Sequence, residues 1–500
     1  MAQLSGTIIV DPSFVLAPLD RRIFGTFVEH MGRCVYGGIY EPGHPTADQN
    51  GSRQDVLALT RELGATIVRY PGGNFLSGYN WEDGVGPREK RPKRLDLAWG
   101  STESNEFGTN EFITWCKAAG VEPMLAVNLG TRGPDEARHF IEYCNHPGGS
   151  HYSDLRRAHG YEQPHDIRFW CLGNEMDGPW QICQKTAEEY GRVAQETAKV
   201  MRWVDPRVQL TACGSSHRGM PTYGHWEQEV LERCFDQVDC ISLHQYFRND
   251  SNDIKTYFGV IADLDSFIRE VAAIADAVAA KRRSPKRIML SLDEWNVWYK
   301  AHTPEDLRKP GWPFAPPLIE EVYNFEDALI VGGVLITLMN NADRVKVACL
   351  AQLVNVIGAI MTERGGPAWR QTIFHPFSQA SRFGHGKVLR AAINTTGGDL
   401  LATVLHDETN GRASIFALNR NPQDEIQLAV ELRGLGARQL VFASQLHHGD
   451  LKARNTRSAP DNVSPEDHPD ARVSGSVLNA TLQPLSWNVF VTEPAAAGEH

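Results

Sequence analysis

Short apolar segments of strand length recur eight times through the first three quarters of this chain, and they constrain its fold more than any other feature. Most are continuous runs rich in β-branched residues, as in strands that are buried on both faces. They cover residues 23–30, 66–73, 122–130, 167–175, 208–216, 238–246, 287–295 and 347–355. Segments of helical periodicity lie between them, most clearly at 107–120, 182–204 and 267–283. This alternation predicts an α/β fold, a (β/α)8 barrel with long loops.

A doubly wound open sheet is the structural alternative, but it usually has fewer strands, and the chain has no glycine-rich dinucleotide turn. After about residue 383 the pattern changes to short alternating segments separated by Gly, Asn, Asp and Pro. The strands expected there cover 400–405, 413–419, 425–431, 439–444, 475–482 and 487–493. They predict an all-β, jelly-roll-like sandwich. We therefore expect a barrel over 19–383, a β-sandwich domain over 384–500, and a strand within 1–18 that joins that β-domain.

The charge balance and the cysteine pattern exclude several classes of function. Acidic residues outnumber basic ones by 61 to 50, a formal charge of −11, whereas nucleic acids and anionic membranes require a basic surface. The N-terminus resembles no secretion signal, and no apolar run reaches the length of about 18 residues that a membrane span needs. The nine cysteines include no C-x-x-C pair, which favours reduced thiols over disulfides or structural zinc. We expect a cytoplasmic protein that binds neither nucleic acid nor membrane.

Polar side chains follow most of the predicted strands at their carboxyl ends, where the active sites of barrel enzymes lie. They are Glu29 and His30, Arg69 and Asn74, Asn128, Asn174 and Glu175, His244 and Tyr246, Glu294, Gln352 and Asn355. Glu175 and Glu294 end strands four and seven, on opposite sides of the barrel, so their carboxylates can converge on one bond. Such a pair suits cleavage of a glycosidic bond, with one carboxyl protonated and the other ionised. The alternative is a pair of salt-bridged acids at the barrel rim.

Five short motifs at these strand ends bear on the family of the chain. FGTFVEH (24–30), VRYPGGNF (68–75), GYNW (78–81) and DEWNVW (293–298) occur in this order, with LGNE (172–175) at strand four. Together they resemble glycoside hydrolase family 51, within the clan A retaining glycosidases, and the resemblance runs the whole length of the chain. That family consists mainly of intracellular α-L-arabinofuranosidases. The resemblance implies exo-acting hydrolysis of terminal non-reducing α-L-arabinofuranosyl residues from arabino- or arabinoxylo-oligosaccharides, with no cofactor and no metal.

Matching motifs also imply roles for single residues. Glu175 is then the general acid/base and Glu294 the nucleophile of a two-step reaction through a covalent glycosyl-enzyme. The resemblance implies that Asn174 donates to the sugar 2-hydroxyl, and that Arg69 and Tyr246 orient the nucleophile. The other substrate-binding residues that we expect are Glu29, Asn74, Trp99, His244, Trp298 and Gln352.

Several of these residues have a structural alternative. Arg69 can instead form an ion pair with Glu29 at the rim, and His244 can be a hydrogen-bonded structural histidine. Trp99 can anchor its loop, and Trp298 can pack beneath the proline-rich loop 301–317, which we expect to be a wall of the site. The Gly72–Gly73 pair can be a turn that needs positive φ.

Other functions are open on the same scaffold. A β-xylosidase or an endo-β-glucanase would use the same carboxylates, and a non-catalytic sugar-binding barrel would need neither. The chain lacks the motifs of zinc proteases, α/β-hydrolases and P-loop NTPases. The resemblance implies a homo-oligomer, with hexamers usual in the family. The 1,2-, 1,3- and 1,5-linkages are all open, as is the length of the natural substrate.

Overall fold

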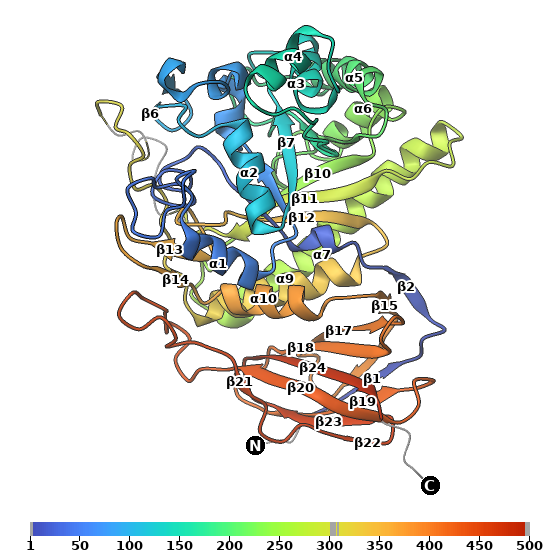
Figure 1. Cartoon of the computed structure of the whole chain (residues 1–500). Coiled ribbons are helices and arrows are strands. Elements are labelled where there is room, and N and C mark those ends of the chain that lie inside the picture. Colours follow the sequence, from blue (N-terminus) through green and yellow to red (C-terminus); the bar gives the residue numbers. More distant parts are fainter. Residues whose placement is uncertain (1–3, 301–306, 308–309, 496–500) are drawn as a thin grey trace.

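The computed structural model describes residues 4–300, 307 and 310–495. Eight parallel strands form a closed barrel above a separate β-domain (Figure 1). In chain order the barrel strands are β3 (Gly25–Phe27), β4 (Ile67–Tyr70), β7 (Glu122–Val127), β8 (Phe169–Leu172), β9 (Gln209–Ala212), β10 (Cys240–Phe247), β11 (Met289–Val297) and β12 (Val345–Ala351). Each lies within or overlaps one of the eight apolar segments, so the predicted (β/α)8 barrel is confirmed.

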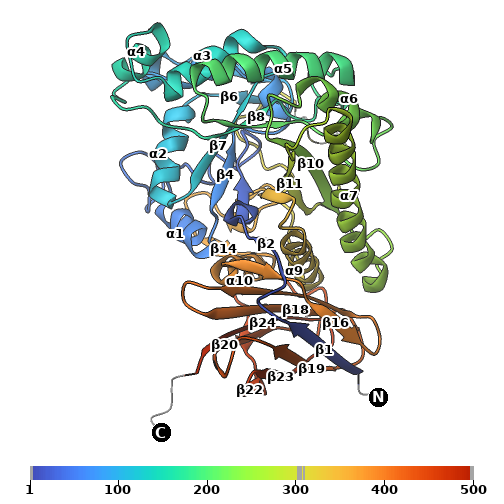
Figure 2. The ribbon, with the colours of Figure 1, turned by 90° about the vertical axis from the view of Figure 1, so that its right-hand side faces the viewer.

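At least one helix follows every barrel strand and packs on the outside of the barrel (Figure 2). The helices are α1 (Gln54–Leu63), α2 (Thr109–Ala119), α3 (Pro134–Asn145), α4 (His151–Ala158), α5 (Ala187–Val204), α6 (His225–Cys234), α7 (Ile254–Lys281), α9 (Phe325–Asn340) and α10 (Phe374–Phe383). Helix α2 ends at Gly120, whose φ of 76° is left-handed and suits glycine. Helix α5 begins later than its periodicity suggests, because the side chain of Thr186 accepts the Glu189 N–H as an N-cap.

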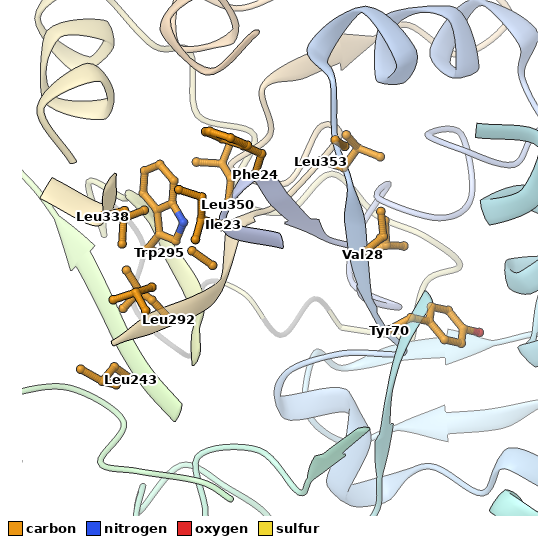
Figure 3. Close-up of a cluster of buried hydrophobic side chains, with 14 of the residues drawn as sticks. Ile23, Phe24, Val28, Tyr70, Leu243, Leu292, Trp295, Leu338, Leu350 and Leu353 are labelled. Carbon is orange, nitrogen blue, oxygen red and sulfur yellow. The ribbon is translucent and has the colours of Figure 1, made fainter. Parts of the chain in front are cut away.

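Two apolar layers hold the barrel together. Inward-facing side chains from β3, β4, β7, β8 and β12 fill its interior, among them Phe27, Met124, Phe169 and Cys349. The outward-facing side chains pack under the helices, and Figure 3 shows Leu292 and Trp295 of β11 beside Leu338 of α9. Because both faces of these strands are buried, their sequences are apolar without alternation.

The β-domain consists of two sheets packed face to face. One has the strand order β16–β1–β19–β23–β22 and the other β2–β15–β17–β18–β24–β20–β21. Their bounds are β1 (Leu4–Val10), β2 (Val15–Pro18), β15 (Lys387–Leu389), β16 (Ala392–Thr395), β17 (Leu400–Asp407), β18 (Arg412–Asn419), β19 (Ile426–Leu432), β20 (Arg438–Leu446), β21 (Glu466–Asp467), β22 (Arg472–Ser474), β23 (Val477–Leu482) and β24 (Ser486–Pro494). Strand β1 runs parallel to β19 and antiparallel to β16, so the start of the chain is built into this domain.

The larger sheet is sandwiched between the barrel and the smaller sheet (Figures 1 and 2). On β18, Phe416 and Leu418 belong to the core that is shared with the barrel, while Ile415 and Ala417 face the smaller sheet. The ring of Trp487 packs on Gly332 of α9, where an added Cβ would lie 2.6 Å from it, and its Nε1 donates to Gln379 Oε1 at 2.8 Å. The single tryptophan of this domain is therefore an interface residue.

Two further predictions concern the environment of the chain. No helix within the described residues is long and apolar enough to cross a membrane. All nine cysteines are free thiols, and eight of them are buried.

Candidate active site

A pocket of about 720 Å³ opens at the carboxyl end of the barrel strands. Eight of the eleven residues predicted from the sequence line it: Glu29, Asn74, Trp99, Glu175, Tyr246, Glu294, Trp298 and Gln352. The other three, Arg69, Asn174 and His244, are buried behind the wall. Each of these three bonds to a lining residue, so all eleven predicted residues lie in or directly behind one pocket.

Glu294 on β11 is held at both carboxylate oxygens. The guanidinium of Arg69 on β4 donates to Oε1 at 2.6 Å, and the hydroxyl of Tyr246 on β10 donates to Oε2 at 3.0 Å. Arg69 does not pair with Glu29, so the rim ion pair considered above is absent. A cation and a hydroxyl donor both favour the charged form of a carboxylate. Glu294 is therefore held in a fixed orientation.

Two consecutive carboxylates of β11 face the barrel mouth, although neighbouring residues of a regular strand point to opposite faces. The pairing of β11 with β12 shifts register between Leu292 and Trp295, so Asp293 and Glu294 sit at an irregularity. Asp293 Oδ2 lies 3.4 Å from Arg69 Nε. Burial would raise the pKa of Asp293, but Arg69 and His244 lower it overall. The sequence analysis did not select Asp293, because the face of β11 on which its side chain lies depends on this bulge.

Glu175 follows β8 with a left-handed backbone, at a φ of 46°. Its Oε1 lies 2.9 Å from His244 Nδ1, and its Oε2 accepts the indole N–H of Trp180 at 2.6 Å. One oxygen of Glu175, one of Glu294 and one nitrogen of His244 all lie within 4.8 Å of one another. The two carboxylates thus face each other across the pocket. Trp180 is a second residue that the sequence analysis missed.

His244 lies between the carboxylates and faces one with each ring nitrogen. Its Nε2 is 3.3 Å from Asp293 Oδ1, while Nδ1 faces Glu175 and is 3.5 Å from Glu294 Oε2. Burial would lower the pKa of His244, but Glu294, Asp293 and Glu175 raise it to about 10. The imidazole is therefore protonated at neutral pH and takes part in the charge network of the site.

A further acid, Glu29, lines the pocket. Its Oε1 accepts the N–H of Phe75 at 3.0 Å and the indole N–H of Trp99 at 2.9 Å, and Oε2 accepts from Gln352 at 3.2 Å. Burial raises the pKa of Glu29 to about 8, despite the Phe75 N–H, and the charge of Glu294 adds to the rise. Trp99 is thus bonded to a polar residue of the pocket as well as belonging to its loop.

The glycine pair that follows β4 makes room for Glu29. A Cβ on Gly72 would lie 2.8 Å from Glu29 Cγ, and one on Gly73 would lie 2.9 Å from Glu29 Oε2. Neither glycine has positive φ, and that of Gly73 is −64°. The alternative of a turn that needs positive φ is therefore wrong. Glycine is needed here for close approach.

The amide of Asn174 has a defined orientation. Arg69, which carries only donors, bonds to its Oδ1 at 2.8 Å, so Nδ2 is the side left to donate. Nδ2 lies 3.4 Å from Oδ1 of Asn74 on the pocket wall. Asn174 is therefore placed directly behind the lining.

Three other polar strand-end residues lie outside the pocket. His30 bonds to Glu103 at 2.8 Å and to the hydroxyl of Tyr70 at 2.7 Å. Asn128 and Asn355 donate to backbone carbonyls of neighbouring loops. These groups are satisfied internally, so they support the loops around the pocket and do not line it.

Comparison with known proteins agrees with this arrangement. A model of the α-L-arabinofuranosidase 1 domain matches residues 59–260, and a model of the α-L-arabinofuranosidase C-terminal domain matches 293–486. The chain is 55% identical to an intracellular exo-α-(1→5)-L-arabinofuranosidase 1 of Bacillus subtilis, over 96% of this chain and 98% of that one. It is 53% identical to an intracellular exo-α-(1→5)-L-arabinofuranosidase of Halalkalibacterium halodurans, over 97% and 99%.

A solved family 51 α-L-arabinofuranosidase from Bifidobacterium longum superposes with a TM-score of 0.93 at 42% identity, covering 98% of this chain and all of that one. The chain belongs to glycoside hydrolase family 51. The barrel, the β-domain and the family predicted from the motifs are therefore all confirmed.

The opposite wall of the pocket in this family 51 chain is aromatic. Trp298 stands edge-on to Tyr246, with ring centroids 5.2 Å apart, and lies below the ammonium group of Lys300 at 5.0 Å. Of the proline-rich loop 301–317, Leu307 lines the pocket, whereas 301–306 and 308–309 lie outside the described residues.

One set of ligand-type groups gathers closely within the described part of this family 51 chain, namely Glu175, His244 and Glu294. His244 Nδ1 lies 2.9 Å from Glu175 and 3.5 Å from Glu294, so the three groups already pair with one another. Both carboxylates already accept hydrogen bonds from Arg69, Tyr246 or Trp180. These groups therefore form an ion-pair network, and we assign no metal to it.

Proposed function

We propose that the chain is a retaining, exo-acting α-L-arabinofuranosidase of the cytoplasm. The observation that carries this proposal is the approach of Glu175 and Glu294 within 4.8 Å, with different partners on each. Retaining glycosidases hold their two carboxyl groups about 5–5.5 Å apart, whereas inverting ones keep about 6.5–9.5 Å for a water molecule. The short separation supports attack by one carboxylate directly on the sugar.

Glu294 is the nucleophile. Arg69 and Tyr246 each donate to one of its carboxylate oxygens and keep it aimed into the pocket. Its oxygen bonds to the anomeric carbon as the glycosidic C–O bond breaks, while Glu175 gives its proton to the leaving oxygen. Water, deprotonated by the now ionised Glu175, then displaces Glu294 and releases arabinose with retained configuration.

The charges of the site support Glu175 as the group that carries the proton. The buried cluster holds two cations, Arg69 and His244, and three carboxylates, those of Asp293, Glu294 and Glu175. With all three ionised the cluster is negative by one charge, and protonation of one of them makes it neutral. Arg69 contacts both Asp293 and Glu294 but not Glu175. Protonation of Glu175 therefore loses no ion pair with Arg69, whereas protonation of either of the other two carboxylates does.

The remaining predicted residues bind the furanose. Glu29, Asn74 and Gln352 present polar groups to the sugar hydroxyls, and Asn174 reaches the 2-hydroxyl with the Nδ2 that Arg69 leaves available. Trp99 closes the sugar side and Trp298 the opposite wall, where aromatic faces suit apolar C–H surfaces. His244 acts on the carboxylates and not on the sugar.

The shape of the pocket supports exo action over endo action. Glu29 accepts hydrogen bonds from both Trp99 and Gln352 on the sugar side, which supports a wall there and not an open groove for a polymer chain. The B. subtilis and H. halodurans relatives are both named for the (1→5) linkage and as intracellular enzymes. We therefore propose short α-1,5-linked arabino-oligosaccharides as substrates and the cytoplasm as the location.

We also infer that residues 1–18 and 384–500 form one β-domain beside a barrel of residues 19–383. The pairing of β1 with β19 and of β2 with β15 supports this division. We propose a homo-oligomer, with a hexamer as the expected form, and its native mass from multi-angle light scattering is the test.

The function is tested by comparing hydrolysis of 4-nitrophenyl α-L-arabinofuranoside and 4-nitrophenyl β-D-xylopyranoside, with proton NMR of the first-formed sugar. We expect a preference for the furanoside of at least about 100-fold and release of the α-anomer first. A preference for the xyloside would support the β-xylosidase alternative. Binding of arabinose without cleavage of either glycoside would support a non-catalytic sugar-binding barrel.

A further inference from the structure

The segment after β8 folds back on itself so that Trp180 covers the side chain of Glu175, five residues earlier. The N–H of Gly178 donates to the carbonyl of Glu175 at 2.9 Å, and the N–H of Gln181 donates to the carbonyl of Gly178 at 3.0 Å. These two successive turns bring the indole N–H to Oε2 of Glu175 at 2.6 Å.

Gly178 lets the indole take this position. A Cβ added there would lie 2.6 Å from Cε2 and 2.9 Å from Nε1 of Trp180. The ring also stacks on His217, with planes 10° apart and centroids 6.2 Å apart, and it remains 45% exposed. Trp180 therefore makes a definite contact with Glu175 while being free enough to leave it.

Both oxygens of Glu175 meet a donor in this arrangement. Protonated His244 donates to Oε1 and Trp180 donates to Oε2. Because an indole N–H can only donate, its hydrogen bond to Oε2 is stronger with the ionised carboxylate than with the protonated carboxyl. The arrangement suits the ionised form that activates water and opposes the protonated form that begins the reaction.

We propose that Trp180 is a positioning residue that switches Glu175 between its two forms, and that the indole must leave Oε2 before Glu175 can act as an acid. This inference rests on the proposed function. When a substrate enters, its leaving group displaces the indole, and a proton from solvent binds Oε2. That proton passes to the glycosidic oxygen as the C–O bond breaks. After the leaving group departs, the ionised Glu175 takes a proton from the attacking water, and Trp180 returns to Oε2 once that proton has passed to solvent.

His244 cannot replace Trp180 in this role. Its pKa of about 10 keeps its proton in place through neutral pH, and both of its nitrogens face carboxylates. The ionisable groups that face Glu175 from all neighbouring elements are His244 and Tyr246 of β10, Glu294 of β11, Lys300 after β11, His217 after β9 and Asp177 of its own loop. Trp180 is the uncharged and half-exposed donor among the contacts of Glu175.

The test is the pH dependence of kcat/KM for wild type and Trp180→Phe with a phenyl α-L-arabinofuranoside that has an unactivated leaving group. We expect the basic limb of the mutant to move by about one pH unit to higher pH, as when an ionised carboxylate loses one charge-assisted hydrogen bond. With a 2,4-dinitrophenyl leaving group, which needs no acid, we expect no difference in the basic limb.

Two further variants separate the N–H contact from the shape of the wall. Gly178→Ala keeps the indole but displaces it, so it should move the basic limb in the same direction. Trp298→Phe makes the same change on the opposite wall, where the indole N–H has no hydrogen-bond partner among the described residues, and should leave the basic limb in place whatever its effect on KM.

An unchanged basic limb in Trp180→Phe and Gly178→Ala, with KM alone increased, would overturn the proposal and leave Trp180 as a wall of the pocket. Failure of the proposed function is distinguishable, because then the wild type would not cleave the phenyl arabinofuranoside at all.

Discussion

The two sides of the pocket are built differently. The sugar side consists of Glu29, Arg69, Asn74, Trp99, Tyr246, Glu294 and Gln352, and most of these are bonded to one another and buried. The leaving-group side consists of Glu175, Trp180, His217, Trp298 and Lys300, where Trp180 is half-exposed and Lys300 is exposed. A buried, hydrogen-bonded sugar side suits one small ring, whereas a more exposed leaving-group side suits several leaving groups. Mutations on the two sides should therefore differ in how they depend on the leaving group.

The largest effect is expected at the centre of the sugar side. Glu294→Gln keeps the volume but removes the nucleophile and leaves Arg69 without its charged partner. We expect kcat to fall by about 10⁴-fold or more for every leaving group, measured by steady-state hydrolysis. The matched control is Glu62→Gln, whose surface ion pair with Arg370 is far from the pocket and should change activity less than about twofold. Near wild-type turnover in Glu294→Gln would remove it as nucleophile.

Glu175→Ala changes the leaving-group side, so its effect should depend on the leaving group, unlike that of Glu294→Gln. We expect kcat/KM to fall by about 10³-fold for an arabino-oligosaccharide, which needs proton donation. For 2,4-dinitrophenyl α-L-arabinofuranoside the loss should be much smaller, because that leaving group departs without a proton. An equal loss for both substrates would assign Glu175 to the sugar side and contradict the comparison.

The fold could be predicted from the sequence because the burial of a strand determines its local pattern of apolar and polar residues. The eight barrel strands are buried on both faces, so each appears as a continuous apolar run, and polar residues at their ends mark the mouth. On β18 both faces are also buried, but its alternating Phe416 and Ile415 pack against different layers. The start of α7 at Ile254 was missed, since the periodic signal was strongest only in its second half.

Two residues of the site could not be predicted, for a geometric reason. Asp293 faces the mouth beside Glu294 only because β11 is irregular there, and regular alternation would have put the two on opposite faces. Trp180 reaches Glu175 through two successive turns, which have no periodic signature. The sequence did contain one signal for each residue. Asp293 belongs to the motif DEWNVW, and Trp180 follows Glu175 by five residues.

A smaller effect is expected at the edge of the sugar side. Trp99→Phe removes the indole N–H that bonds to Glu29 at 2.9 Å but keeps an aromatic ring. We expect kcat/KM to fall by about 5- to 10-fold, equally for good and poor leaving groups. Trp203→Phe is the control, because Trp203 lies on α5 and is 77% exposed. A loss that varies with the leaving group would place Trp99 on the other side.

The buried acid of the sugar side should make stability fall as pH rises. The pKa of Glu29 is about 8 in the folded chain and lies near its ordinary value of about 4.3 when unfolded. The folded state therefore binds more protons than the unfolded state between these values, and the free energy of unfolding decreases from about pH 4.3 to about pH 8. Glu29→Gln should flatten this slope in thermal unfolding, whatever its absolute stability. An unchanged slope would contradict the assigned pKa.

The smallest effect expected is none. The proposed two-carboxylate mechanism uses no metal ion, so dialysis against a chelator should change the rate less than about twofold. Activity that is lost and then restored by a divalent cation would contradict the two-carboxylate mechanism.

The central claim is the division of labour between Glu175 and Glu294, and azide rescue tests it most directly. Glu294→Ala and Glu175→Ala are each incubated with azide and an activated α-L-arabinofuranoside, and the anomeric configuration of the arabinosyl azide is read by NMR. The mechanism predicts the inverted β-azide from Glu294→Ala, where azide replaces the nucleophile. It predicts the retained α-azide from Glu175→Ala, where azide attacks the glycosyl-enzyme. The reverse assignment, or one configuration from both variants, would contradict the account.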